Sequence, residues 1–211
     1  MNRLMFSLPL ICVPFLLSAQ DKETEPFLQN EVSVGMGGGF PLEKDPLNVP
    51  GEQTVPASFG LNIGYRRYLE SNLAVGVRLN GYINKLPGYT ITDQSNSTMS
   101  ADFNFEMFNL SLEGLMLFSS GSVRPYALLM VGLAAGKLSH DELGNLSLSG
   151  IAGGGGLGVQ FEISQTVAIA IEGLGSFGSA KWEKKPFSNS AGDEFNPAVF
   201  MALANVLIRF P

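Results

Sequence analysis

The only histidine of the chain, His140, stands among residues that could form a catalytic site. Ser139 precedes it, Asp141 and Glu142 follow it, and Ser147 is close by, so a nucleophile, a base and an acidic partner all occur in one segment. The same residues could bind a metal ion. Catalysis requires mutual hydrogen-bond geometry, which adjacency in a polar loop does not supply. We therefore interpret His140 as a solvated loop residue and expect no enzyme activity, no metal and no other cofactor.

A second candidate is the segment "GIAGGGGLGVQFE" (150–162), in which Gly153, Gly155 and Gly158 have the G-x-G-x-x-G spacing of a dinucleotide-binding turn. That turn binds pyrophosphate only where it ends a strand and opens a helix. Here apolar and polar residues alternate after the glycines, which is the period of a strand. We therefore reject nucleotide binding. We expect Gly158 and the other glycines of its parity to make room inside a narrow sheet structure.

The elements that must position these residues are strands. Eight segments of roughly ten residues alternate between apolar and small or polar residues, and no amphipathic helix competes with them. They lie at 30–40, 57–68, 73–84, 102–118, 124–136, 150–162, 166–178 and 198–210. Segment 124–136 is apolar on both faces, so its parity is open. Phe103 and Phe105 depart from the parity of Phe108, which predicts either a bulge near Met107 or a strand end beyond a membrane.

Long polar connections alternate with tight ones along the chain. The long ones are 41–55, 85–101, 137–147 and 179–196, and the tight ones are 69–72, 119–122 and 164–165. This alternation predicts an all-β fold, an eight-stranded antiparallel up-and-down transmembrane β-barrel, because a closed sheet satisfies its backbone hydrogen bonds within lipid. The first connection is long, so we expect the long loops to be extracellular and both termini periplasmic.

The distribution of residues between the two faces separates a membrane barrel from a soluble one. A lipocalin-like barrel turns its apolar residues inward and its polar residues outward. In this chain one face carries nearly all large aliphatic residues and the other collects small and polar ones, which favours lipid outside and a tight polar lumen. We expect an aromatic girdle at the periplasmic end. It comprises Tyr65, Tyr68, Phe118, Phe161 and Phe210.

The first 19 residues have the features of a secretory signal peptide, with Arg3 before an apolar stretch and Ala19 before the cleavage site. Cys12 is the only cysteine and is lost with this segment. The mature chain therefore has no disulfide and no cysteine-based chemistry. The domains that we expect are the signal peptide at 1–19, a short periplasmic segment at 20–29, and the barrel at 30–211.

Charge argues against nucleic acid as a partner. The full chain carries 13 basic and 19 acidic residues, a net charge of −6, and removal of Arg3 makes it −7.

The segments 124–136 and 153–164, together with the terminal "NVLIRFP", resemble the OmpA/OmpX-type eight-stranded outer-membrane barrels. This resemblance implies localisation in the outer membrane, contact with outer-membrane lipids and lipopolysaccharide, and insertion by the barrel-assembly machinery. It also implies that Val206, Ile208 and Phe210 form the assembly signal, although Pro211 follows the aromatic residue that usually ends such chains. The periplasmic cell-wall-binding domain of larger relatives is not expected.

Some barrels of this kind acylate or deacylate lipid A with a histidine, a serine and an acidic residue. The His-x-Ser spacing of the deacylases is absent here, because Glu142 takes the position of the serine. The loop at 179–196 could bind a partner or a polysaccharide through Trp182 and Phe187, but we favour Trp182 as an anchor at the membrane interface.

We expect a non-enzymatic integral outer-membrane protein with a lumen filled by side chains, serving envelope integrity, adhesion or surface interaction. Two alternatives stay open. One is an accessory subunit of an outer-membrane secretion or assembly complex, with another outer-membrane protein as its partner. The other is a lipid A-modifying enzyme that uses His140.

Six charged residues fall on the inward parity, where an ion is costly unless it is paired. Counting from the tight turns places them at two heights. The middle layer consists of Arg78, Glu113 and Glu172, and the layer near the periplasmic strand ends consists of Arg66, Glu162 and Arg209. We predict one ion cluster in each layer. The alternative for the second layer is that its three side chains reach periplasmic water.

Overall fold

The computed structural model describes residues 29–42, 57–92, 98–140, 144–183 and 194–211. The expected signal peptide lies outside these residues. The described strands are β1 (Asn30–Pro41), β2 (Ser58–Glu70), β3 (Leu73–Thr92), β4 (Thr98–Leu117), β5 (Val123–His140), β6 (Gly144–Glu162), β7 (Val167–Trp182), β8 (Glu194–Phe195) and β9 (Ala198–Phe210). No helix long and apolar enough to cross a membrane occurs in the part of the chain that the structure describes.

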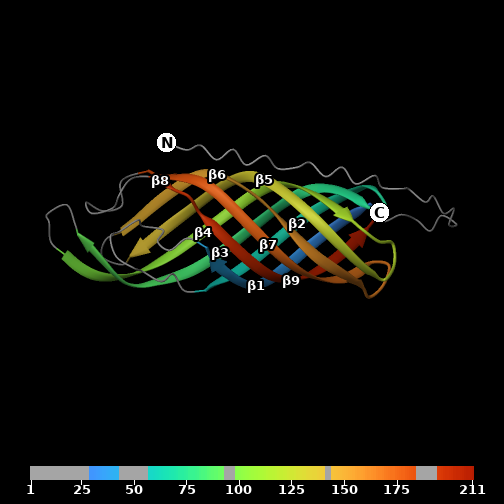
Figure 1. Ribbon diagram of the computed structural model, residues 1–211, viewed down its shortest axis with the longest axis horizontal. Coiled ribbons are helices and arrows are strands. Elements are labelled where there is room, and N and C mark those ends of the chain that lie inside the picture. The colour runs from blue at the N-terminus through green and yellow to red at the C-terminus, as the bar shows by residue number, and fades with distance from the viewer. Residues whose placement is uncertain (1–28, 43–56, 93–97, 141–143, 184–193) are drawn as a thin grey trace, which may run out of the picture.

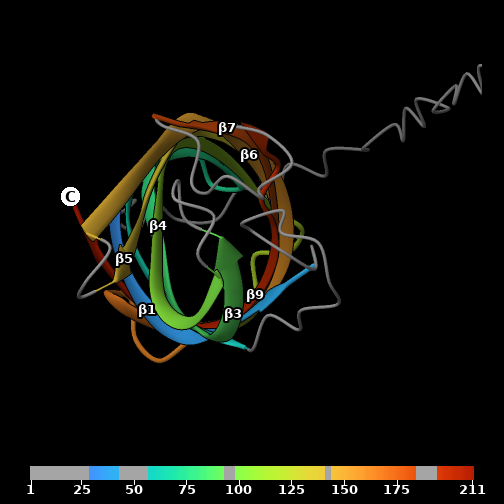
Figure 2. The same ribbon diagram turned by 90° about the vertical axis from the view of Figure 1, so that its left-hand side faces the viewer.

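The eight long strands form one closed antiparallel barrel. Strands β1 to β7 pair in chain order, β7 pairs with β9, and β9 pairs with β1 to close the sheet. Strand β8 has two residues and pairs with β7 beyond the point where β9 begins. Figure 2 looks along the barrel and shows the strands arranged in a ring. The expected eight-stranded up-and-down barrel is therefore confirmed.

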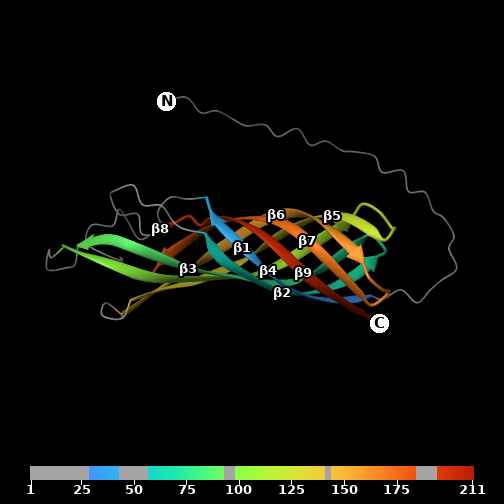
Figure 3. The ribbon, with the colours of Figure 1, turned by 90° about the horizontal axis from the view of Figure 1, so that it is seen from below.

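The two ends of the barrel differ. At one end, which we call the turn end, tight connections join β2 to β3, β4 to β5 and β6 to β7, and the C-terminus lies there (Figure 1). At the other end, which we call the hairpin end, β3 and β4 extend far beyond β1, β2 and β9 (Figures 1 and 3). Much of 85–101, 137–147 and 179–196, which we expected to be loop, is therefore strand.

Strand β4 keeps one parity throughout, so the expected bulge near Met107 is wrong. Met107 pairs with Tyr82 on β3 and with Gly136 on β5 in an unbroken register. Phe103 and Phe105 are buried and face the lumen, as Met107 does. Phe108 faces outward, so the three phenylalanines lie on opposite faces of one regular strand. The irregularity in this hairpin lies in β3 instead, between residues 86 and 89.

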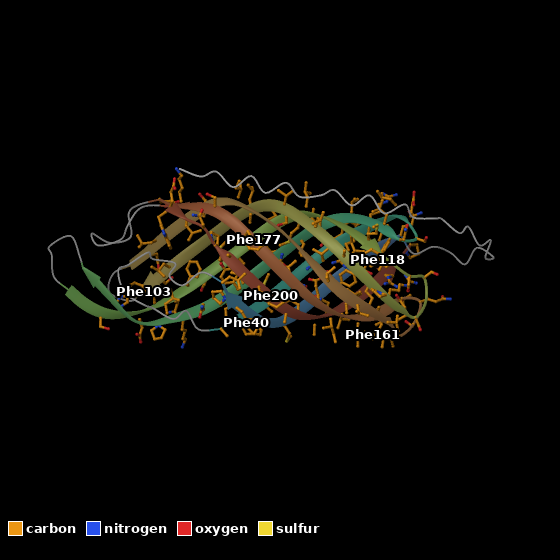
Figure 4. The ribbon with its side chains drawn as sticks, in the orientation of Figure 1. Phe40, Phe103, Phe118, Phe161, Phe177 and Phe200 are labelled. Atoms are coloured by element: carbon orange, nitrogen blue, oxygen red, sulfur yellow. The ribbon has the colours of Figure 1, made fainter. Side chains whose placement is uncertain are left out.

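The outward face forms an apolar belt between two rings of exposed aromatic residues. Toward the turn end lie Tyr65, Phe118, Phe161 and Phe210, and toward the hairpin end lie Phe40, Phe59, Phe108, Phe177 and Phe200. Figure 4 labels Phe118 and Phe161 of the first ring and Phe40, Phe177 and Phe200 of the second. Between the rings the outward residues are aliphatic, or they are Met, Gly, Ala or Pro. From Phe200 to Phe210 the strand rises by about 3.3 Å per residue, so a tilt of about 40° gives a belt about 25 Å tall.

The barrel wall rises past this belt at β3 to β7, and farthest at β3 and β4. Strand β3 continues nine residues beyond Ile83 to Thr92, and β4 begins ten residues before Phe108. By contrast, β1 ends at Pro41, one residue past Phe40. Strands β2 and β9 also begin within two residues of the outward aromatic residues that mark this edge of the belt, Phe59 and Phe200. The β3–β4 hairpin therefore projects beyond the belt (Figures 1 and 3).

Candidate functional site in the barrel interior

Each of the eight long strands contributes one charged side chain to a single series of ion pairs in which positive and negative charges alternate. In order, the members are Glu172 of β7, Arg78 of β3, Glu113 of β4, Arg66 of β2, Glu31 of β1, Arg209 of β9, Glu162 of β6 and Arg124 of β5. We call this series the ion chain. Alternation along the strands directs one face inward, and the tight lumen of an eight-stranded barrel brings the charges into contact.

Arg78 is the second member of the ion chain, next to Glu172 at one end, and it lies near the middle of the belt. Its Nε lies 2.9 Å from Glu113 Oε2, and its guanidinium donates two hydrogen bonds to the carboxylate of Glu172. The second of these, from Nη2 to Oε2, is 3.1 Å long. The contact with Glu172 joins β3 to β7, which are not neighbours in the sheet. All three residues of the predicted middle layer therefore lie in contact.

Arg66 differs from the prediction, because it does not belong to a separate layer near the strand ends. Its Nε donates to Glu113 Oε1 over 2.6 Å, and its Nη1 donates to Glu31 Oε1 over 2.9 Å. Arg66 is 1% exposed, so it does not reach water at the turn end. The long guanidinium side chain spans the two expected heights, and this contact makes one ion chain out of two clusters.

Glu31 is a member of the ion chain that the sequence reasoning missed. Its carboxylate accepts hydrogen bonds from Arg66, from Arg209 and from the hydroxyl of Tyr68 at 3.0 Å. Its parity, opposite to that of the outward residues Val34 and Met36, could have identified it. The same contact corrects Tyr68, which is 4% exposed and faces inward and therefore does not belong to the outward girdle.

The ion chain ends at the turn end of the barrel. Arg209 Nη1 donates to Glu162 Oε2 over 2.6 Å, and its Nη2 donates to the side-chain oxygen of Gln160 over 2.8 Å. Arg124 Nε lies 3.2 Å from Glu162 Oε1, and its side chain is 24% exposed. Sequence reasoning missed Arg124 because the parity of its strand was open. The buried charges thus meet water through this last pair.

The ion chain holds four arginines and four glutamates, so its charges balance. Buried ions are costly unless each one is paired and hydrogen-bonded, and removal of one partner leaves the other charge uncompensated. Within the ion chain each internal member contacts two opposite charges. The ion chain links all eight long strands. Three of its contacts, Arg78–Glu172, Arg66–Glu113 and Arg209–Glu162, join strands that are not neighbours in the sheet.

Gly158 has the role that its parity predicted. A Cβ at this position would overlap the ring of Tyr126, which lies across the glycine from β5. The Tyr126 hydroxyl donates to Glu172 Oε2 over 2.8 Å. The glycine therefore allows a buried tyrosine to reach the end of the ion chain.

The hairpin end of the interior is aromatic. The rings of Phe105 and Trp182 lie 6.5 Å apart between centroids, and those of Phe105 and Tyr82 lie 6.0 Å apart. Trp182 is 4% exposed, so its expected role as an outward interface anchor is wrong. It lies inside because it has the parity of Leu174 and Ala180 on β7. Phe187, the other aromatic residue of that expected loop, lies outside the described residues.

Of the candidate catalytic residues, the structure describes His140, Ser139 and Ser147, and it does not bring these three together. His140 ends β5 on the inward parity, and its ring packs on Phe103 at 5.2 Å between centroids. Ser139 is adjacent in the strand and Ser147 has the parity opposite to buried Leu148, so both hydroxyls are directed to the other face of the sheet. Asp141 and Glu142 lie outside the described residues.

The terminal strand presents the predicted assembly residues to the outside. Val206, Ile208 and Phe210 are 48%, 51% and 40% exposed. They alternate with Leu207 and Arg209, which face the lumen. Recognition of these three residues by the barrel-assembly machinery is still a prediction.

No protein-family profile matches the sequence, and no curated protein matches it either. Among solved structures, Neisserial surface protein A from Neisseria is similar with a TM-score of 0.56 and 14% identity, over 86% of this chain and 97% of that protein. The attachment invasion locus protein Ail of Yersinia pestis gives a TM-score of 0.49 at 16% identity, over 86% of this chain and 99% of Ail. The outer-membrane protein OprG of Pseudomonas aeruginosa gives 0.47 at 13% identity, over 85% and 96%. The first likeness is one of fold.

Proposed function

We propose that this chain, which has the fold of the eight-stranded outer-membrane barrels, is an integral outer-membrane protein that presents its β3–β4 hairpin for adhesion or another surface interaction. The observation that carries the proposal is the one-sided extension of β3 and β4 beyond the apolar belt. A barrel that only had to span lipid needs strands of about 9–11 residues. Each of these two strands has 20, and β5 and β6 follow with 18 and 19. The β3–β4 hairpin projects farthest from the barrel (Figures 1 and 3).

The apolar belt supports the membrane location. Its estimated height matches the apolar band of about 25 Å in outer-membrane barrels, which aromatic girdles flank. We place the hairpin end outside the cell and the turn end in the periplasm, as the long first connection predicts. The expected contacts of the belt are outer-membrane lipids and lipopolysaccharide.

The filled lumen supports a role other than solute passage. The ion chain and the aromatic residues above it occupy the interior with side chains that are almost fully buried. We expect no large stable currents when the purified protein is inserted into planar lipid bilayers. Such currents would contradict the filled lumen and favour a porin.

Single cysteines can test the orientation, since Cys12 lies in the segment that is expected to be cleaved. Pro87→Cys lies in the β3–β4 hairpin, and Gly121→Cys lies in a tight connection where a Cβ would meet nothing within 4 Å. In intact cells a membrane-impermeant maleimide is expected to label the first cysteine and to spare the second. The reverse pattern would invert the proposed orientation.

Shortening the hairpin tests the surface interaction itself. Leu86 and Phe103 are direct partners, so a two-residue turn can join them without touching the ion chain. The shortened protein is expected to keep the heat-dependent gel migration of a folded barrel. Cells that carry it are expected to aggregate and to adhere to matrix-coated surfaces less than cells with the parent protein. Equal adherence would show that the hairpin is not the interaction surface, and a stoichiometric partner in mild detergent extracts that survives the shortening would favour the accessory-subunit alternative.

We also propose that the protein is not an enzyme, because His140 and the nearby serines point to opposite faces of the sheet. His140→Ala is therefore expected to leave the lipid A acylation pattern unchanged in mass spectra of whole-cell lipid A. Loss of one acyl modification in the variant, with normal amounts of folded protein, would make this barrel a lipid A-modifying enzyme.

A further inference from the structure

The part of β3 that rises past the belt has an edge without a neighbouring strand. Ile83 is the last residue of β3 that pairs with β2, through Phe59, and among the described residues nothing pairs with that side of β3 from residue 84 to residue 92. We call this side of 84–92 the open edge. Figure 3 shows the hairpin clear of the neighbouring strands. The unpaired N–H and C=O groups of such an edge are a template on which another chain can add a strand, so natural proteins either use it or protect it.

Two hydrogen bonds near the turn end show which backbone groups face the open edge. Leu117 N donates to the oxygen of Asn72, directly before β3. Phe118 N donates to the oxygen of Pro125 on β5. Neighbouring residues of a strand direct their backbone groups to opposite sides, so the odd residues of β4 face β3 and the even ones face β5. Through the pairing of β3 with β4, the odd residues of β3 up to Lys85 face away from β4, and Lys85 therefore faces the open edge.

A β-bulge follows directly after Lys85. The register between β3 and β4 shifts between residues 86 and 89, so two residues of β3, Pro87 and Gly88, lie opposite Asp102 alone. Gly88 has a φ of 67°, a backbone conformation that favours glycine. A Cβ at this position would meet nothing within 4 Å. The conformation of the bulge, and not crowding, therefore requires the glycine.

The bulge interrupts the series of backbone groups along the open edge. Pro87 faces this edge and has no N–H to donate. Tyr89 is the direct partner of Ala101, which faces β3, so the next residue that faces the open edge is Thr90. An added strand needs a donor and an acceptor at every second residue, and here the series breaks after Lys85. A lysine at an edge is itself a device by which natural proteins keep edges unpaired.

Asp102 supports the bulge from the neighbouring strand. As an even residue of β4 it directs its own backbone groups toward the side of β5, away from the bulge. Its side chain supplies an acceptor instead, because Gly88 N donates to Asp102 Oδ1 over 2.7 Å. An ionised acceptor makes a hydrogen bond stronger than a neutral one does. Asp102 is therefore a positioning residue for the bulge.

We propose that the open edge of β3 is protected against strand addition, and that Asp102 maintains this protection by holding the bulge at Pro87 and Gly88. The strand to be kept away is above all the same edge of a second copy, because copies in one membrane present this edge at the same height. A partner of the hairpin, as proposed above, is then bound through side chains on its faces and not as an added strand. The readouts that follow are oligomeric state and amide exchange, so they are independent of the adhesion test.

Removal of the bulge tests the protection. Deletion of Gly88 combined with Pro87→Thr restores a regular register and the missing donor. This variant is expected to form dimers or larger assemblies in detergent, measured by light scattering after size-exclusion chromatography, whereas the parent stays monomeric. The protein with the shortened hairpin lacks the open edge, and as the matched control it should also stay monomeric. The proposal fails if the regular variant keeps the gel migration of a folded barrel and is monomeric, or if the parent forms a dimer that shortening abolishes.

Hydrogen exchange of the Gly88 amide, followed by nuclear magnetic resonance, tests the role of Asp102 without any change in β3. In Asp102→Ala this amide loses its acceptor, so its exchange is expected to be about tenfold faster than in the parent. Asp102→Asn keeps an oxygen acceptor and removes the charge, so it should retain most of the protection. Equal exchange in the parent and Asp102→Ala, or in the two variants, would show that the hydrogen bond from Gly88 to Asp102 does not hold the bulge.

Discussion

Glu31 and Arg209 are direct partners across the seam at which the first strand meets the last, and Arg209 Nε lies 2.9 Å from Glu31 Oε2. The same carboxylate accepts a hydrogen bond from Arg66 on β2. One buried side chain therefore joins the two strands that close the barrel to the rest of the ion chain. Removal of its negative charge should leave two buried arginines each without one of their opposite charges.

The first prediction concerns this carboxylate. Glu31→Gln keeps the size of the side chain and removes its charge, so Arg66 and Arg209 each lose an opposite charge in a buried site. We expect a loss of about 3–5 kcal/mol in the free energy of unfolding, the range for breaking a buried pair. The fluorescence of Trp182, the only tryptophan, can follow urea unfolding in detergent. Glu70→Gln, at an exposed position, is the control, and equal midpoints for the two variants would refute the role of Glu31.

The second prediction concerns Arg78, near the Glu172 end of the ion chain. Arg78→Leu fills most of the same space but leaves the carboxylates of Glu113 and Glu172 without their common partner. The expected cost is again on the order of 3–5 kcal/mol. Arg67→Leu makes the same chemical change at an exposed position and should have little effect. Unfolding of Arg78→Leu at the urea concentration of the parent would mean that these ion pairs do not stabilise the fold.

A third prediction tests the space that Gly158 leaves for Tyr126. Gly158→Ala adds a Cβ that overlaps the tyrosine ring, so the ring must move and the 2.8 Å hydrogen bond to Glu172 is strained or lost. We expect destabilisation by about 1–3 kcal/mol, as for other overpacked interiors. Gly114→Ala is the matched control, because a Cβ there would meet nothing within 4 Å. If both alanine variants unfold alike, the glycine is not needed for this contact.

The fourth prediction concerns the terminal strand. Removal of the last five residues, 207–211, deletes Ile208, Arg209 and Phe210 and exposes unpaired edges of β1 and β7. Lipid offers no hydrogen bonds to such edges, so we expect the shortened protein to fail to insert. Gel migration with and without heating, on membranes from expressing cells, measures insertion. Deletion of Pro211 alone should leave migration normal, and a normally inserted 207–211 deletion would show that this strand end is dispensable.

Much of the fold was predictable from the sequence because a strand repeats every two residues. The outward positions of Val206, Ile208 and Phe210 followed from alternation alone, as did the inward positions of Arg78 and Glu172. Prediction failed where a local signal was ambiguous. Trp182 was assigned to a membrane interface because aromatic residues are common there, yet its strand continues past the belt and turns it inward.

The sequence by itself determined which side chains face lipid and which face the lumen, since neighbouring residues of a strand point to opposite sides whatever the strand pairs with. Only the tertiary structure decided which interior charges meet. Arg66 contacts Glu113 past the intervening strand β3, and Arg78 contacts Glu172 across the lumen. These contacts depend on strand tilt, on the register of each pair and on the reach of a guanidinium group, which are properties of the closed barrel and of no single segment.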